Sequence, residues 1–162
     1  MATDTLKELA RASAISPKES PFAIQNKHHS LSLGLPKESS EFEKRIALTP
    51  DAVALLVKNG MSVSVETGAG LSANYSDMDY SNAGAQIVFS HKEIFENDII
   101  LKIEPLKDEE FEYIKPNATL ISTLNLPVLD QAYFNNLNKK KITAIAFEFI
   151  EDKVGEFPII RA

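Results

Sequence analysis

Apolar residues recur along the chain in two alternating patterns, which predict a succession of strands and helices. Short runs rich in Val, Ile and Leu alternate with stretches in which apolar residues recur every three to four positions. The predicted strands are 31–35, 61–66, 86–89, 99–103, 118–124 and 142–147. Strand, helix and strand joined by short turns form crossover units, so the pattern predicts an α/β fold with a parallel sheet.

Capping residues mark the boundaries of the predicted helices. Thr49 precedes Pro50, a residue pair favoured at a helix start, and Gly60 closes that helix. Ser76 is expected to cap a second short helix that ends at Gly84. The other predicted helices are 91–96, 108–114 and 127–138.

The two ends of the chain differ from its middle. Residues 3–14 have apolar positions at helical spacing, and residues 15–29 contain two Ser-Pro pairs typical of a linker. We therefore expect an amino-terminal helix and linker over 1–29 and one domain over 30–162. The last six residues, 157–162, form an apolar strand-like run, which indicates that this chain is a fragment of a longer protein.

Composition narrows the class of protein. A chain of 162 residues with 44% hydrophobic and 25% charged residues is typical of a globular domain. A net charge of −6 argues against a nucleic-acid partner, and the absence of cysteine excludes disulfides and thiolate metal sites and fits the cytoplasm. No apolar run approaches the roughly 20 residues that span a bilayer. His28, His29 and His91 are expected in linker or surface positions and form no metal-like cluster.

Arg45 is the first candidate site residue. It lies on a loop that leads into the capped helix start at Thr49, where a guanidinium and free amides can bind a carboxylate. A plain alternative is a surface arginine paired with Glu41 or Glu43.

Gly68–Ala73 fits the loose pattern G-x-G-x-x-A after a predicted strand. A dinucleotide loop needs a helix that opens directly after it, and Asn74, Tyr75 and Ser76 intervene here. The glycines are therefore better interpreted as tight-turn residues.

The tips of two apolar strands are further candidates. Polar residues of 102–105 and 122–127 follow these strands, and ligands of open parallel sheets bind beyond the carboxyl ends of strands. The alternative is that strand ends are polar because they meet water.

Several of these segments together resemble one protein family. Gly34-Leu-Pro-Lys-Glu38, Glu43 and Arg45-Ile-Ala-Leu-Thr-Pro50 resemble the opening of the alanine dehydrogenase and nicotinamide nucleotide transhydrogenase family. Further matches in register are Val65-Glu-Thr-Gly-Ala-Gly70, Ser76-Asp-Met-Asp-Tyr80, Ala83-Gly-Ala85, Ile100-Leu-Lys102 and Thr143-Ala-Ile-Ala-Phe-Glu148. The resemblance runs from about residue 31 to residue 162.

The resemblance implies a flavodoxin-like (Rossmann-like) doubly wound parallel sheet that forms the amino-terminal, substrate-side domain of an oxidoreductase. It also implies that NAD is bound mainly by a nucleotide-binding domain absent from this chain, so the fragment alone is expected to be inactive. Self-association into a homo-oligomer is expected for the intact protein, because family members assemble as dimers or hexamers.

The resemblance also assigns roles to single residues. Arg45 matches the arginine that binds the substrate carboxylate in family alanine dehydrogenases. Lys102 matches the first lysine of their Lys-Val-Lys-Glu-Pro segment and is the candidate catalytic residue, whereas Glu104 replaces the second lysine, which contacts the carbonyl. Asn125 replaces their histidine and is a candidate substrate-binding residue, since an amide hydrogen-bonds a carbonyl but does not shuttle a proton near neutral pH.

Three functional hypotheses follow. The first is the substrate-side domain of an NAD-dependent alanine dehydrogenase, which converts L-alanine to pyruvate and ammonia, so that its partner is a small amino acid or 2-oxo acid. The second is part of a transhydrogenase α subunit with a membrane partner subunit, because those subunits also lack the lysine and the histidine. The third is a packing or assembly domain, in which Arg45 forms a structural ion pair and binds no anion.

Overall fold

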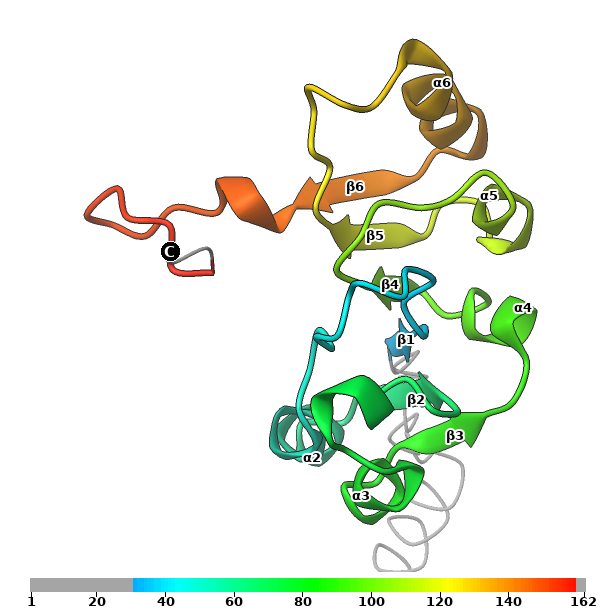
Figure 1. The fold of residues 1–162 in the computed structure, drawn as a ribbon, viewed down its shortest axis with the longest axis vertical. Coiled ribbons are helices and arrows are strands. Elements are labelled where there is room, and N and C mark those ends of the chain that lie inside the picture. The colour runs from blue at the N-terminus through cyan, green and yellow to red at the C-terminus, as the bar shows by residue number, and fades with distance from the viewer. Residues whose placement is uncertain (1–30, 160–162) are drawn as a thin grey trace, which may run out of the picture.

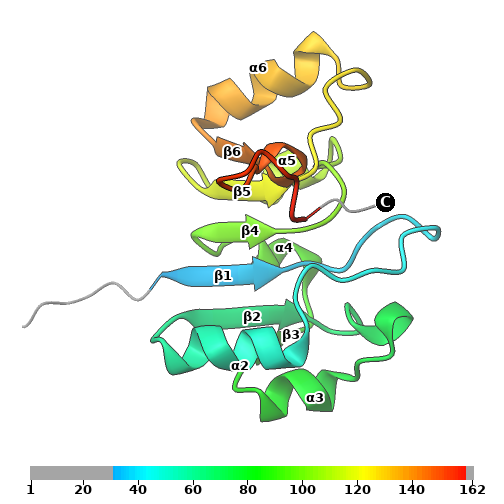
Figure 2. The same ribbon diagram turned by 90° about the vertical axis from the view of Figure 1, so that its left-hand side faces the viewer.

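Six strands lie side by side in one sheet, and all five strand pairs are parallel (Figures 1 and 2). The computed structural model describes residues 31–159. The strands are β1 (Ser32–Leu35), β2 (Ser62–Glu66), β3 (Gln86–Val88), β4 (Ile99–Leu101), β5 (Thr119–Ser122) and β6 (Thr143–Ala146). Their order, β3-β2-β1-β4-β5-β6, is the Rossmann-type order, whereas the flavodoxin type has 2-1-3-4-5. The predicted doubly wound parallel sheet is thus confirmed, in its Rossmann-like form.

Helices cover both faces of the sheet, because the chain reverses its direction of travel across the sheet after β3. The helices are α2 (Pro50–Lys58), α3 (Asp77–Asn82), α4 (His91–Ile94), α5 (Glu110–Tyr113) and α6 (Gln131–Lys140), with short 3₁₀ turns η1 (Leu71–Ala73) and η2 (Phe147–Phe149). Right-handed crossovers place α2 and α3 on one face and α4, α5 and α6 on the other (Figure 1). The switch in direction lies between β1 and β4, which are neighbours in the sheet.

Two apolar clusters hold these layers together, one on each face. The cluster under α2 and α3 contains Leu33, Leu35, Val53, Val63, Val65, Tyr80 and Ala85. The cluster under α4, α5 and α6 contains Val88, Ile94, Phe95, Ile100, Leu106, Phe111, Ile114, Ala118, Leu120, Leu124, Tyr133 and Leu137. Strand side chains alternate between the faces, so β4 contributes to both clusters: Ile100 belongs to the second, whereas Ile99 and Leu101 pack against the first.

Local capping chemistry sets most of the helix boundaries as the sequence predicts. The side chain of Thr49 accepts a hydrogen bond from the amide of Ala52, and Ser76 forms a capping box with Asp79. Gly60 and Gly84 have φ angles of 89° and 91°, a region that favours glycine after a helix.

The predicted start of the helix over 127–138 is wrong. Residues 127–130 precede the helix, with a turn in which the amide of Val128 donates to the carbonyl of Asn125 over 2.8 Å. Asp130 then caps α6, because its carboxylate accepts a hydrogen bond from the amide of Tyr133 over 2.9 Å. The capping carboxylate, and not the proline, decides where this helix begins.

Of the predictions for the two chain ends, the structure tests only those for residues 157–159. Residues 157–159 form no strand, so the strand-like character expected there is wrong for these three positions. The predicted amino-terminal helix and linker, and residues 160–162, lie outside the described residues.

Asp98 joins three elements at the amino-terminal edge of the sheet. Its Oδ2 accepts hydrogen bonds from the amide and the hydroxyl of Ser32, and its Oδ1 pairs with Lys115 Nζ at 2.5 Å. Hydrogen bonds from Lys115 and Ser32 lower the pKa of Asp98 to about 2. The ionised carboxylate therefore ties the start of β1 to β4 and to the turn after α5.

We expect Asp98→Asn to lower the free energy of unfolding by about 1 to 2 kcal/mol near neutral pH, because the ion pair is lost and the site is partly exposed. The folded-state pKa is lower than the unfolded one, so this stabilisation is present above about pH 4 and is lost as the pH falls toward 2. Urea unfolding near pH 7 and near pH 2 measures both effects. Asp108→Asn, at an exposed position, is the control. An equal loss at both pH values would contradict this account.

Candidate active site at the carboxyl edge of the sheet

The carboxyl ends of the parallel strands meet at one edge, and the candidate residues follow them. The amide and hydroxyl of Thr123 both donate to the carbonyl of Ile103, over 3.0 and 2.8 Å. The segments after β4 and β5 therefore lie side by side. The loop 36–49, which carries Arg45, leaves the neighbouring strand β1.

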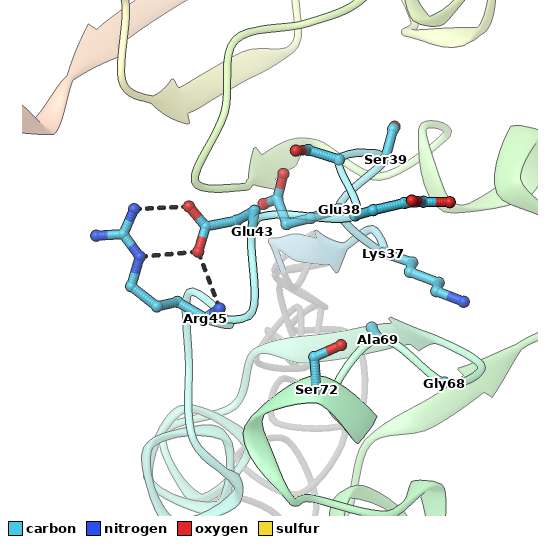
Figure 3. A pocket seen from close by; sticks show the side chains of 10 residues that line it. Lys37, Glu38, Ser39, Glu43, Arg45, Gly68, Ala69 and Ser72 are labelled. Atoms are coloured by element: carbon cyan, nitrogen blue, oxygen red, sulfur yellow. Dashed lines mark hydrogen bonds and ion pairs between the residues drawn. The ribbon is translucent and has the colours of Figure 1, made fainter.

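Arg45 lies at this edge with its guanidinium paired to Glu43 (Figure 3). Nε lies 2.8 Å from Oε1 and Nη2 lies 2.6 Å from Oε2, while the amide of Arg45 donates to Oε1 over 2.9 Å. The side chain of Arg45 is nevertheless 73% exposed. The hydrogen bond from Arg45 lowers the pKa of Glu43, so the carboxylate stays ionised. The pairing with Glu43, one of the two sequence-based alternatives, is thus present.

Arg45 borders two hollows of different character. The first, of about 260 Å³, is polar and is lined by Lys37, Glu38, Ser39, Ser40, Glu41, Glu43, Arg45, Gly68, Ala69 and Ser72. Within it, the charged ends of Arg45 and Lys37 point to opposite sides (Figure 3). The second is an apolar groove of about 660 Å³, lined by Arg45, Ile46, Ala47, Leu48, Leu101, Ile103, Ile121, Thr123, Phe147, Ile150 and Ile159. A guanidinium between a polar and an apolar hollow is suited to a ligand with a carboxylate and an apolar part.

Lys102 is placed at the strand tip but points away from this groove. Leu101 and Ile103 line the groove, so the residue between them projects from the opposite face of the sheet. Its side chain is 1% exposed, and Nζ lies 2.9 and 2.8 Å from the two carboxylate oxygens of Glu110 in α5. The structure therefore does not bring Lys102 and Arg45 into one cavity, and the catalytic role of Lys102 stays a prediction.

His91 lies beside this buried ion pair and connects it to a second carboxylate. Its Nε2 lies 3.3 Å from Glu110 Oε1, and its Nδ1 lies 2.8 Å from Glu66 Oε2 at the end of β2. The sequence-based expectation of a surface position for His91 is wrong, since only 31% of the side chain is exposed and both ring nitrogens meet carboxylates. The sequence did not mark Glu66 or Glu110 as candidate site residues. The one available signal is the position of Glu66, a charged residue at the end of a strand whose Val63 and Val65 are buried.

Glu38 is another residue that the sequence did not single out by itself. Its carboxylate accepts hydrogen bonds from the amides of Ile103, at 2.5 Å, and Glu104, at 3.4 Å. Burial raises the pKa of Glu38, and the amide of Ile103 opposes that shift. The loop after β1 is thus fastened directly to the segment after β4.

Asn125 lies in a tight turn after β5 with a φ of 39°, and it is exposed. Its amide and that of Leu124 both donate to Glu148 Oε1, over 2.9 and 2.7 Å. The other oxygen, Glu148 Oε2, is buried and has no hydrogen-bond partner among residues 31–159. Asn125 lines neither of the hollows beside Arg45, and its role in substrate binding stays a prediction.

The glycine segment after β2 does not fit a dinucleotide. It leads into the three-residue turn η1 and not into an α-helix, so it offers no helix amino terminus for a pyrophosphate. Gly68 has a φ of 73°, and a Cβ on Gly70 would lie 2.6 Å from the ring of Tyr80. The tight-turn interpretation is therefore confirmed.

The described part of the chain lacks two further features, a metal-binding cluster and a membrane-spanning helix. Residues 31–159 contain no group of three or more His, Cys, Asp or Glu side chains arranged to hold a metal ion. None of the helices within the same range has the length and apolar character needed to cross a membrane.

Comparison with known proteins decides the family. The profile of the family "Alanine dehydrogenase/PNT, N-terminal domain" matches residues 34–161. The chain belongs to this family. Among curated relatives, the alanine dehydrogenase of Bacillus subtilis (strain 168) is 37% identical over 123 residues, which are 74% of this chain and 32% of the relative.

Solved structures give the same assignment. An L-alanine dehydrogenase superimposes with a TM-score of 0.75 at 32% identity, over 80% of this chain and 36% of that one. A transhydrogenase from Sinorhizobium meliloti superimposes with a TM-score of 0.68 at 27% identity, over 74% of this chain and 35% of that one. This member of the alanine dehydrogenase/PNT family thus spans about a third of the length of the relatives that it matches.

Proposed function

We propose that this chain is the substrate-side domain of an NAD-dependent alanine dehydrogenase-like oxidoreductase, which converts L-alanine to pyruvate and ammonia in the cytoplasm. The observation that supports this proposal most strongly is the position of Arg45. It lies at the carboxyl edge of the sheet in an alanine dehydrogenase/PNT N-terminal domain, beside both a polar and an apolar hollow. Relatives named alanine dehydrogenase and a solved L-alanine dehydrogenase support this choice of reaction.

In this proposal, the residues of the chain bind and orient the substrate. Arg45 binds the carboxylate of the amino acid or 2-oxo acid through the donors that Glu43 leaves free, and the apolar groove shields the methyl group. Asn125 donates a hydrogen bond to the carbonyl oxygen. NAD, when bound, accepts hydride from the substrate α-carbon, and its binding falls to the part of the relatives that this chain does not span, because the glycine segment here does not fit a dinucleotide.

A transhydrogenase α subunit is the second candidate. Glu104 and Asn125 stand where family alanine dehydrogenases have a lysine and a histidine, so proton transfer by the usual groups is missing. The likeness to a transhydrogenase structure favours the same alternative. In that case the domain serves hydride transfer between NAD and NADP, together with a membrane subunit.

A packing or assembly domain is the third candidate, and one observation favours it. The hypothesis requires Arg45 to form an ion pair within the chain, and the pair with Glu43 fulfils that requirement. Its second requirement, that no anion binds beside Arg45, is open to direct test by titration of the full-length protein with pyruvate.

The deciding experiment measures turnover by the full-length protein. We expect NADH to form when L-alanine and NAD are supplied together, and not when either is omitted. A second assay supplies NADPH and an NAD analogue without alanine. Turnover in the second assay alone would replace our proposal by the transhydrogenase alternative, and turnover in neither would leave the assembly domain.

A further inference from the structure

His91 occupies an unusual place for a residue with no assigned role. It lies between the carboxylates of Glu66, from β2, and Glu110, from α5, with ring nitrogen to oxygen distances of 2.8 and 3.3 Å. The ring satisfies both carboxylates only when both of its nitrogens carry hydrogen, that is, as an imidazolium. A neutral ring would direct one nitrogen lone pair at a carboxylate oxygen.

An imidazolium at His91 offsets negative charge at a site where the carboxylates of Glu66, Glu110 and, through Lys102, Glu38 come together. Glu110 is fully buried and pairs with Lys102 from β4, which leaves the Glu66 carboxylate to be neutralised by His91. The other groups packed on the ring are the edges of Phe95 and Tyr113, with centroid distances of 5.1 and 6.3 Å. Without its charge, these carboxylates would face one lysine in a largely buried site, and such an imbalance is costly.

The same two carboxylates hold the start of the loop that carries Arg45. Glu66 Oε2 accepts a hydrogen bond from the amide of Lys37 over 2.8 Å, and Glu110 Oε1 accepts one from the hydroxyl of Ser39 over 3.4 Å. Further along this loop, the amide of Glu43 donates to the carbonyl of Ser40, and Glu43 in turn holds Arg45. Polar contacts therefore connect His91 to Lys37 and Ser39, and the backbone, the hydrogen bond between Glu43 and Ser40, and the Glu43 carboxylate continue from there to Arg45.

We propose that His91, as an imidazolium bridging Glu66 and Glu110, is the positioning residue for the loop 36–49 and hence for Arg45. His91 itself does not contact substrate. It keeps two anions close enough together to hold Lys37 and Ser39 at the mouth of the polar hollow. Without this bridge, the two anions separate and the loop is freed.

The test uses the full-length protein with His91→Gln, and Lys92→Gln as the matched control. Lys92 is the next residue of α4 and is exposed, so its substitution removes a positive charge outside the bridge. The first measurement is the hydrogen-exchange protection factor of the amides of 37–45, corrected for the intrinsic exchange rate of each residue. We expect His91→Gln to lower the protection of the Lys37 amide about tenfold, and the control to leave it unchanged.

A second variant separates this role from simple packing. Glu66→Gln removes one of the two anions that His91 bridges and leaves the ring of His91 in place. It should also lower the protection of the Lys37 amide, and it keeps the test decisive if His91→Gln does not fold.

A kinetic measurement completes the test and rests on the proposed function, in which Arg45 binds the substrate carboxylate. KM for the carboxylate substrate should rise about tenfold in His91→Gln, with kcat within about twofold. Exchange in the loop of His91→Gln and of Glu66→Gln that matches the unaltered protein would overturn the inference. Absence of any turnover would count against the proposed function alone, because the exchange measurement needs no substrate.

Discussion

Glu110→Gln is expected to lower the free energy of unfolding by about 3 to 5 kcal/mol, because it leaves the Lys102 ammonium buried without a counter-charge. Lys102 is 1% exposed and Glu110 is fully buried, with Nζ 2.8 and 2.9 Å from the carboxylate oxygens. Water does not reach either charge in the folded protein. Each partner therefore depends on the other, and the loss of one is far more costly than the loss of an exposed charge.

A double-mutant cycle tests this dependence. Lys102→Met should be destabilising to a similar extent, whereas the double variant Lys102→Met/Glu110→Gln should lose less than the sum of the two, since no uncompensated charge is buried. In the unaltered protein, the amide of Lys107 donates a hydrogen bond to Glu110 over 2.7 Å. The Glu110→Gln variant keeps a side-chain oxygen that can accept this bond. The free energies come from urea unfolding followed by circular dichroism.

The control for this cycle is Glu112→Gln. Glu112 lies in the same helix, α5, and is exposed, so its substitution should change stability by less than about 0.5 kcal/mol. Additive effects of the two single substitutions would mean that Lys102 and Glu110 do not stabilise each other, and the account of the buried pair would be wrong.

Arg45→Ala is expected to reduce kcat/KM of the full-length enzyme by roughly 30- to 5,000-fold, which corresponds to about 2 to 5 kcal/mol for a lost charged contact. A guanidinium has five N–H donors, and Glu43 engages those on Nε and Nη2. The remaining donors, including both on Nη1, can bind a substrate carboxylate while Glu43 holds the side chain in place. The Glu43 pair is therefore compatible with substrate binding and orients the arginine for it.

Two variants sharpen this measurement. Arg45→Lys keeps the positive charge but not the planar fork, so its activity should lie between that of the unaltered protein and Arg45→Ala. Lys44→Ala removes the neighbouring exposed cation and should leave kcat/KM within about twofold. If Arg45→Ala matches Lys44→Ala in whichever assay is active, Arg45 has no part in substrate binding.

Most of the fold was predictable from the sequence because it rests on local interactions. Strand positions follow from short apolar runs, and helix starts follow from capping residues such as Thr49 and Ser76, whose partners lie three residues away. The beginning of α6 was missed because two plausible start signals, Pro127 and Asp130, stand close together, and only the bond from the Tyr133 amide distinguishes them.

The candidate site was predictable only in outline. The sequence indicated Arg45 and the two strand tips as separate candidates, and the shared direction of the strands explains why all three lie at one edge of the sheet. It also left the pairing of Arg45 with Glu43 as an alternative, because the two residues are only two positions apart. The direction in which Lys102 projects was not anticipated, although it follows from strand alternation once Leu101 and Ile103 are known to line the groove.

Acting alone, the sequence determined the α/β class, the element boundaries set by caps and glycines, and the family motif that contains Arg45. The tertiary structure decided which distant residues became partners. Glu110 meets Lys102, His91 meets Glu66, and Glu148 meets the turn of Asn125 over separations of 8, 25 and 23 residues. Such partners depend on strand order, on register and on the face from which each side chain projects. Those quantities are set by the packing of all elements together, and no local pattern encodes them.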